Sequence, residues 1–208
     1  MGASGPLSSS ARLVAPRRGR RPSVSRQDVL TAALGLVERH GLAALTMRDL
    51  AAELGVAVGT VYAAAGGKDE ILQGLADTVL GDLAELEVAG LGWADALVAL
   101  FSEWHRLMLA HPAIAQLSVL EPLVGPGISA GQDVIFGVIQ RAGFADQDVI
   151  TLFTTLSSYT AGYTLCQISR PSSPGPRDQA GQRREIQLTD EQFVSGLRAL
   201  LGGFVPGR

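Results

Sequence analysis

The stretch Thr60–Glu70, TVYAAAGGKDE, holds residue types that suit phosphate binding. Glycines let a backbone turn tightly and bring its N–H groups close to an anion, and a lysine adds a positive charge. Such a run serves either the phosphate loop of a nucleotide hydrolase or a joint between two helices that hold another phosphate. The hydrolase loop needs a glycine separated by four residues from its Gly-Lys pair and Ser or Thr after it. Those positions hold Tyr62 and Asp69, so the second use is favoured.

Composition favours a packed helical protein. The chain has 208 residues, of which 47% are hydrophobic and 18% charged, and Ala and Leu supply many of the apolar ones. This length allows one substantial core or two small ones. No apolar run approaches the roughly 20 residues that span a membrane, and the N-terminus lacks a hydrophobic signal core. The single cysteine, Cys166, cannot form an internal disulfide, so the expected location is the bacterial cytoplasm.

Helical periodicity repeats along most of the chain. Ser25 is the expected cap of a first helix that ends at Gly41, and Thr46 is the expected cap of a second that ends at Gly55. A third covers about 57–64, and a long fourth opens at Asp69. Further helices are predicted at roughly 93–110, 112–120, 127–142, 146–169 and 189–203. No alternating strand pattern is found, so the predicted fold class is all-α, with Pro171–Gln187 as a mobile loop.

Three short helices around a tight glycine turn predict a helix-turn-helix. Ala51, Gly55 and Val61 have the required spacing: a small residue at the crossing, a glycine in the turn and an aliphatic residue that locks the second helix. The second helix of such a unit lies in the DNA major groove. Its exposed side would carry Ala57, Val58, Gly59, Thr60, Tyr62 and Ala63.

The stretch Ser25–Leu75 resembles the DNA-binding domain of the TetR family of bacterial transcriptional regulators. The similar pieces are Gly41-Leu42, the run 45–51 (LTMRDLA), Leu54-Gly55-Val56, Thr60-Val61-Tyr62, and Lys68 before an amphipathic helix. Two later segments, 158–167 (SYTAGYTLCQ) and 193–204 (FVSGLRALLGGF), look like the dimerising helices of the tetracycline-repressor branch.

The resemblance implies a three-helix DNA-binding domain followed by a larger helical domain for ligand binding and dimerisation. The expected division is an arginine-rich disordered arm over 1–24, a DNA-binding domain over 25–70 and an effector-binding and dimerisation domain over 71–208. Gly66-Gly67 would end the recognition helix, so that Lys68 faces a DNA phosphate. Arg48 is expected to read a guanine edge, and Thr46 to give its backbone N–H to phosphate. The remaining expected DNA contacts are Val58, Gly59, Thr60 and Tyr62.

The chain departs from the family pattern in two features. Where the family has a large residue, a histidine and an aromatic or aliphatic residue, this chain has Ala63, Ala64 and Ala65, which removes a phosphate contact and packing bulk. Up to Arg26 the chain has six arginines and no acid, whereas Arg26–Leu72 has four basic and six acidic residues. The arm, with Arg20 and Arg21, is therefore expected to supply phosphate or minor-groove contacts, unless it is only a tail.

The resemblance further implies a homodimer on a palindromic operator, with DNA released by a small, mostly apolar effector. The expected effector residues are Trp104, His105, Met108, Tyr159 and Tyr163. His111 falls where the tetracycline-repressor branch has a metal-binding histidine, but no further ligands can be assigned, so neither metal nor cofactor is expected. The effector, the operator sequence and the choice between repressor and activator stay open.

Two other functions compete with this interpretation. Cys166 with His105 or His111 would be a thiol nucleophile pair, although no local signature supports an enzyme. The alanine run also allows a helical protein–protein adaptor that has lost specific DNA binding.

Overall fold

The structure is a computed structural model that describes residues 24–120, 122–170, 172–177, 179 and 183–207. The described part of the chain is helical apart from one hairpin, which confirms the all-α prediction. The helices are α1 (Arg26–His40), α2 (Met47–Glu53), α3 (Val58–Ala65), α4 (Lys68–Gly81), α5 (Trp93–Ala110), α6 (Pro112–Leu120), α7 (Pro126–Arg141), α8 (Asp146–Ser169) and α9 (Asp190–Leu201), with 3-10 turns η1 (Leu42–Ala44) and η2 (Asp82–Glu85). None of them is long and apolar enough to cross a membrane.

Side-chain caps set the starts of the first two helices as predicted. Ser25 accepts a hydrogen bond from the Asp28 N–H at 3.1 Å, and Asp28 accepts in return from the Ser25 N–H. Thr46 accepts from the Asp49 N–H at 3.1 Å at the start of α2. Each cap satisfies an N–H group that the helix itself leaves unpaired.

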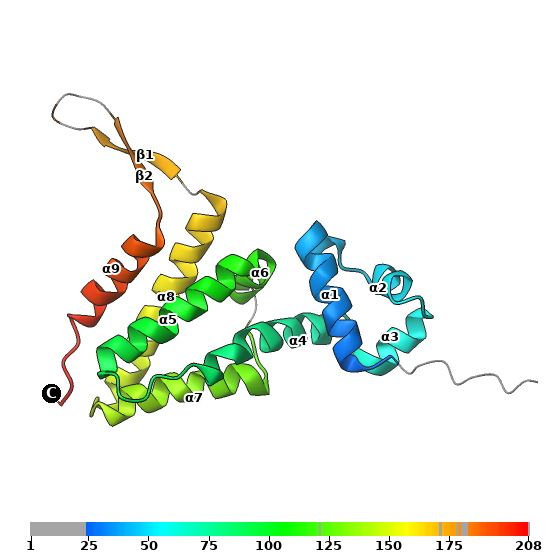
Figure 1. The fold of residues 1–208 in the computed structure, drawn as a ribbon, viewed down its shortest axis with the longest axis horizontal. Coiled ribbons are helices and arrows are strands. Elements are labelled where there is room, and N and C mark those ends of the chain that lie inside the picture. The colour runs from blue at the N-terminus through cyan, green and yellow to red at the C-terminus, as the bar shows by residue number, and fades with distance from the viewer. Residues whose placement is uncertain (1–23, 121, 171, 178, 180–182, 208) are drawn as a thin grey trace, which may run out of the picture.

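The helices form two connected parts (Figure 1). Helices α1–α3 lie together at one end, and α4 runs from them into a body built of α5–α9. Within the body, α5 packs on α8, α7 packs along α4 and η2, and α9 lies against α5 and α8. α4 therefore belongs to both parts and connects them mechanically.

The buried side chains form two hydrophobic clusters. The first, called here the N-terminal core, combines buried residues of α1–α4 with Leu107 and Met108 of α5 and with Ile114, Ala115 and Leu117 of α6. The second, the body core, joins the first half of α5 to α7, α8 and α9. α6 thus contacts α1 and α4 as well as α5 and α8, although its residues lie beyond the predicted boundary at position 70.

The prediction of a structureless loop over Pro171–Gln187 is wrong. Ser172–Arg177 (β1) and Arg183–Gln187 (β2) pair as an antiparallel hairpin that projects from the body between α8 and α9 (Figure 1). The register shifts between Pro174 and Arg177. A two-stranded ribbon has free edges and tolerates prolines at such an irregularity, so the prolines that argued for a loop do not exclude a strand here.

Candidate functional site

The α2–α3 unit has the geometry that the sequence predicts for a helix-turn-helix. Gly55 adopts φ 65°, a left-handed conformation that glycine takes without strain, and the Val56 N–H returns to the Ala51 oxygen at 2.9 Å. Ala51 and Val61 are buried at the crossing of the two helices. Their burial turns the opposite side of α3 toward solvent, which leaves it available to a partner.

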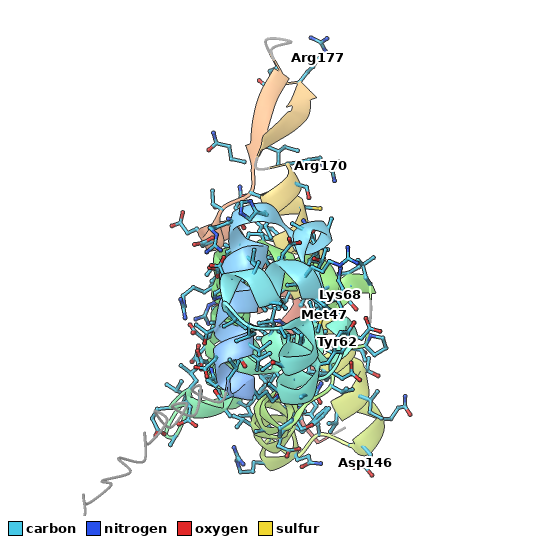
Figure 2. The ribbon with its side chains drawn as sticks, turned by 90° about the vertical axis from the view of Figure 1, so that its right-hand side faces the viewer. Met47, Tyr62, Lys68, Asp146, Arg170 and Arg177 are labelled. Carbon is cyan, nitrogen blue, oxygen red and sulfur yellow. The ribbon has the colours of Figure 1, made fainter. Side chains whose placement is uncertain are left out.

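The candidate DNA contacts lie at the surface. Val58 is half-buried, and the others in the described part of the chain are exposed: Thr46, Arg48, Gly59, Thr60, Tyr62 and Lys68. Tyr62 is 52% exposed, which is unusual for a large aromatic side chain in a small domain. In the view onto this end of the molecule, Tyr62, Lys68 and Met47 lie near one another (Figure 2). Arg20, Arg21 and the rest of the predicted arm up to position 23 lie outside the described residues.

The alanine run divides between surface and core. Ala63 is exposed, Ala64 is half-buried and Ala65 is fully buried at the joint between α3 and α4. Arg26, from the first turn of α1, donates to the Ala65 carbonyl at 3.2 Å and to the Glu70 carbonyl at 3.4 Å. The guanidinium thus binds the end of α3 and the start of α4 where the family pattern has bulk. Sequence analysis missed this role, because the partners are backbone atoms 39 and 44 residues away.

The N-terminus of α7 is capped by a side chain of α4. The Asp77 carboxylate accepts a hydrogen bond from the Ile128 N–H at 2.9 Å, in the first turn of α7. A negative charge at this end also complements the helix dipole. One turn earlier on α4, Gln73 binds the α6–α7 connection through the Pro122 carbonyl and the Val124 N–H. α4 therefore cannot shift along α7 without breaking these bonds.

Backbone contact strengthens the same junction. A Cβ atom at Gly127 would lie 2.8 Å from the Asp77 carbonyl oxygen and 3.0 Å from the Gly81 Cα. Any side chain there would push the two helices apart. α4 and α7 consequently pack backbone to backbone, and this close packing couples α4 to the body.

The five predicted effector residues do not surround one cavity. Tyr159 and Tyr163 line a cavity of about 430 Å³ on α8, together with Cys166, Arg170 and Leu188. Trp104 lines a separate cavity of about 40 Å³ between α4, α7 and α8. Met108 is buried in the N-terminal core, and His105 is buried between α5, α8 and α9.

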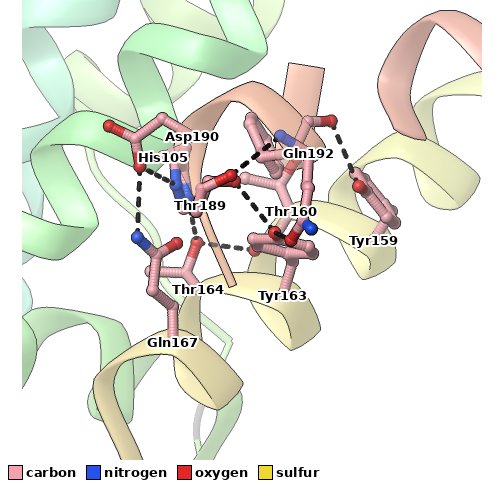
Figure 3. Close-up of polar contacts among 10 residues, drawn as sticks. His105, Tyr159, Thr160, Tyr163, Thr164, Gln167, Thr189, Asp190 and Gln192 are labelled. Atoms are coloured by element: carbon pink, nitrogen blue, oxygen red, sulfur yellow. Dashed lines mark hydrogen bonds and ion pairs between the residues drawn. The ribbon is translucent and has the colours of Figure 1, made fainter. Parts of the chain in front are cut away.

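His105 belongs to a polar junction between helices (Figure 3). Its Nδ1 lies 2.7 Å from the Thr164 hydroxyl oxygen, and its ring stacks on Phe193 with centroids 4.0 Å apart. Thr164 donates its only hydroxyl proton to the Thr160 carbonyl, so Nδ1 must donate to Thr164. In neutral His105 the bare Nε2 therefore faces the Asp190 carboxylate, 3.5 Å away.

Two opposing effects act on this histidine. Burial lowers the pKa of His105, and the negative charge of the Asp190 carboxylate raises it by less. The neighbouring phenols bind the chain of α9 directly: Tyr163 donates to the Thr189 carbonyl and Tyr159 to the Phe193 carbonyl. The junction thus fixes the start of α9 on α5 and α8.

The other histidine of the competing interpretations has a structural partner. His111, at the end of α5, lies 2.8 Å through Nδ1 from the Glu38 carboxylate of α1, which ties the body to the DNA-binding end. Cys166 instead accepts a contact from Arg170 at 3.6 Å. Among the described residues, neither His105 nor His111 is bonded to Cys166, and this gives the thiol-enzyme hypothesis no geometric support.

Two family models match the chain. Residues 29–75 match the bacterial regulatory proteins of the tetR family, and residues 89–193 match the tetracyclin repressor-like C-terminal domain. An HTH-type transcriptional regulator from Saccharopolyspora erythraea is 30% identical over 184 residues, covering 88% of this chain and 76% of the relative. The chain therefore belongs to the TetR family and is a DNA-binding transcriptional regulator.

Solved structures agree with this assignment. BioQ, crystallised with its double-stranded DNA operator, is 27% identical with a TM-score of 0.67, over 86% of this chain and 97% of BioQ. ActR from Streptomyces coelicolor in complex with actinorhodin is 24% identical with a TM-score of 0.73, over 86% of this chain and 96% of ActR. The second likeness shows a shared fold.

Proposed function

We propose that this regulator is a repressor that binds a palindromic operator as a homodimer and releases it when a small, mostly apolar molecule binds the body. The exposed side of α3, held in place by the Gly55 turn, carries the proposal. It presents Thr60 and Tyr62 to solvent with no charged side chain between them. Such a surface suits close approach to a major groove, with Lys68 and Arg48 supplying charge beside it.

Each proposed contact has a distinct role. Arg48 reads a base edge with its forked guanidinium, and Tyr62 donates its phenol to a phosphate. Thr60 places a methyl group against thymine or its hydroxyl on phosphate. Thr46 already uses its hydroxyl to cap α2, so its remaining contribution is its backbone N–H. Val58 and Gly59 contribute shape, because neither carries a polar side chain.

The proposed dimer forms through α8 and α9. The residues Ile150, Thr154, Ser158 and Gly162 recur every four positions along α8, and all are exposed. This stripe is mostly small, so a second copy of the helix can approach closely. α9 lies beside it at the edge of the body (Figure 1), so two copies would assemble a four-helix bundle. A two-fold axis there places two α3 helices on successive turns of one DNA face.

The proposed release uses α4 as a lever. α4 begins with Lys68 at the DNA-facing end and is fastened to α7 through Asp77. A molecule that separates α7 from α4 would tilt Lys68 and α3 together and change the spacing of the two recognition helices. ActR binds actinorhodin, which favours a small molecule as the ligand of this body as well.

Gel shift with DNA fragments from around the regulator's own gene tests the proposal. We expect a retarded band that requires the palindrome and disappears in the double variant Thr60→Ala/Tyr62→Phe. Sedimentation at micromolar concentration should show a dimer. A stable monomer, or no binding to any of the fragments, would favour the adaptor hypothesis instead.

A further inference from the structure

Trp104 occupies a special position between the two hydrophobic clusters. Among the partly buried hydrophobic residues of the described part of the chain, it alone packs against both the N-terminal core and the body core. Its indole also lines the small cavity beside the α4–α7 junction. The walls of this cavity also include Leu80 of α4, Leu83 of η2, Ile128 and Ile135 of α7, and Phe153 of α8.

The indole N–H of Trp104 lacks a hydrogen-bond partner. Its Nε1 atom is buried and finds no acceptor among the described residues. A buried donor normally has an acceptor, because a donor that loses its hydrogen bonds to water and gains no other bond is costly in free energy. On α8, the Ser157 hydroxyl is likewise buried without a partner, one helical turn beyond Phe153 on the same side of the helix.

The walls exclude charged ligands. No charged side chain lines this cavity, and Gln132 is the polar residue beside Trp104 in its lining. An ionised molecule would therefore be buried without a counter-charge, which is strongly unfavourable. The rings of Trp104 and Phe153 and the aliphatic walls favour a flat apolar frame.

We propose that Trp104 is the donor of the effector site, and that the effector is a neutral, planar, mostly apolar molecule with a carbonyl-type acceptor. The ligand accepts a hydrogen bond from the indole N–H and stacks its frame between Trp104 and Phe153. This inference rests on the proposed function, since it assigns the site and the ligand class of the same effector response.

The size of the cavity links binding to movement. At about 40 Å³ it holds little more than a water molecule, whereas ligand sites are usually several hundred Å³. Entry of a planar molecule must therefore move Leu80 and Leu83 away from Ile128 and Ile135. Gly81 and Gly127 are already in backbone contact beside it, so the strain is passed to α4 as a whole.

A single-tryptophan protein makes the donor directly observable. Trp93 is the other tryptophan of the chain, so the variant Trp93→Phe leaves one indole N–H, which ¹⁵N labelling resolves as one NMR signal. The probes are 1-indanone and indane, which share a two-ring frame and differ by one carbonyl group. We expect 1-indanone to move the Trp104 signal to lower field, and indane to leave the N–H without that shift.

A thermodynamic cycle isolates the hydrogen bond. The affinity ratio of 1-indanone to indane is measured in Trp93→Phe and again in Trp93→Phe/Trp104→Phe, which keeps an aromatic ring and removes the N–H. The two ratios should differ by about three- to tenfold, the worth of one net hydrogen bond. Taking a ratio of ratios cancels the different hydration of the probes.

Three results would overturn the inference. They are a ratio of ratios near one, a Trp104 signal that stays still at saturating 1-indanone, and no binding of 1-indanone to the single-tryptophan protein. The NMR result stands even if the double variant fails to fold. Gel shift distinguishes the failure of the Trp104 site from the failure of the proposed function. If a compound releases the operator but leaves the Trp104 signal unchanged, the protein has an effector response and Trp104 is not its site.

Discussion

Arg26 offers a sharp test of how the recognition helix is held. The variant Arg26→Ala removes a guanidinium that binds the Ala65 and Glu70 carbonyls, one on each side of the α3–α4 joint. A hydrogen bond from a charged group contributes about 1.5–3 kcal/mol. Because the second bond is longer and exposed, we count one full bond, which gives a loss of about 1.5–3 kcal/mol in unfolding free energy.

The assay is thermal unfolding with a matched control on the same helix. For a protein of this size each kcal/mol lowers Tm by about 2–4 °C, so Arg26→Ala should lower Tm by about 3–12 °C. The control Arg39→Ala removes an ion pair with Glu53 whose side chains are about half exposed. Such a pair is worth about 0–1 kcal/mol, so Tm should change little. Operator affinity should fall more in Arg26→Ala than in the control.

A second variant reaches the same joint from the other side. A Cβ at Gly74 would lie 2.8 Å from the Arg26 Nη2 atom and 2.9 Å from the Cδ2 atom of buried Leu30, so Gly74→Ala should displace both side chains and lower Tm as well. Equal Tm values for Arg26→Ala and Arg39→Ala would refute the conclusion that Arg26 stabilises the joint between α3 and α4.

Three further predictions concern charge. In gel shifts, Arg48→Ala should relax the base preference at one base pair per half-site by about 1–3 kcal/mol. Lys68→Ala should instead weaken binding to all DNA sequences alike and lower the slope of affinity against salt by about one unit per protomer. Identical salt titrations of the two variants would contradict this division of roles. Because burial holds the pKa of His105 below its ordinary value, the unfolded chain takes up the proton first, so stability should fall as pH drops below about 6.5 and level off below the folded pKa. Tm measured from pH 8 to 5 should show this loss in the natural protein and a flatter profile in His105→Gln. The variant Asp190→Asn tests the carboxylate that raises the pKa of His105, and its profile should fall more steeply. Deleting residues 1–22 should lower DNA affinity several-fold with helix content intact, and an unchanged salt slope would make the arm a mere tail.

Local signals in the sequence were sufficient for most of the helical framework. Ser25 and Thr46 cap the helices they were expected to cap, and α5, α6 and α8 have the predicted bounds. These features depend on residues within one turn of each other, where spacing alone determines the contact. The fourth helix gives way to η2 at Gly81, beside its contact with Gly127.

The features that sequence analysis missed depend on distant partners. Arg26 binds carbonyl groups, which every residue possesses, so no residue type indicated its role. Trp104 lies on α5 and lines a cavity with α4, α7 and α8, whereas Tyr159 and Tyr163 lie on α8 and line another cavity, and an aromatic count does not contain that information. The β1–β2 hairpin depends on backbone pairing across a turn, which proline-rich composition concealed.

The sharing of α6 by the N-terminal core has a consequence for protein engineering. Ile114 is completely buried against side chains of the DNA-binding end, and His111 beside it is bonded to Glu38 of α1. A hybrid regulator joined near position 70 would therefore give the recognition unit a foreign α6 and mismatched apolar surfaces. We expect functional hybrids to need the α5–α6 corner from the same parent as α1–α4. α7 belongs to the same piece, because it packs backbone to backbone on α4 at Gly127 and is capped by Asp77 of that helix.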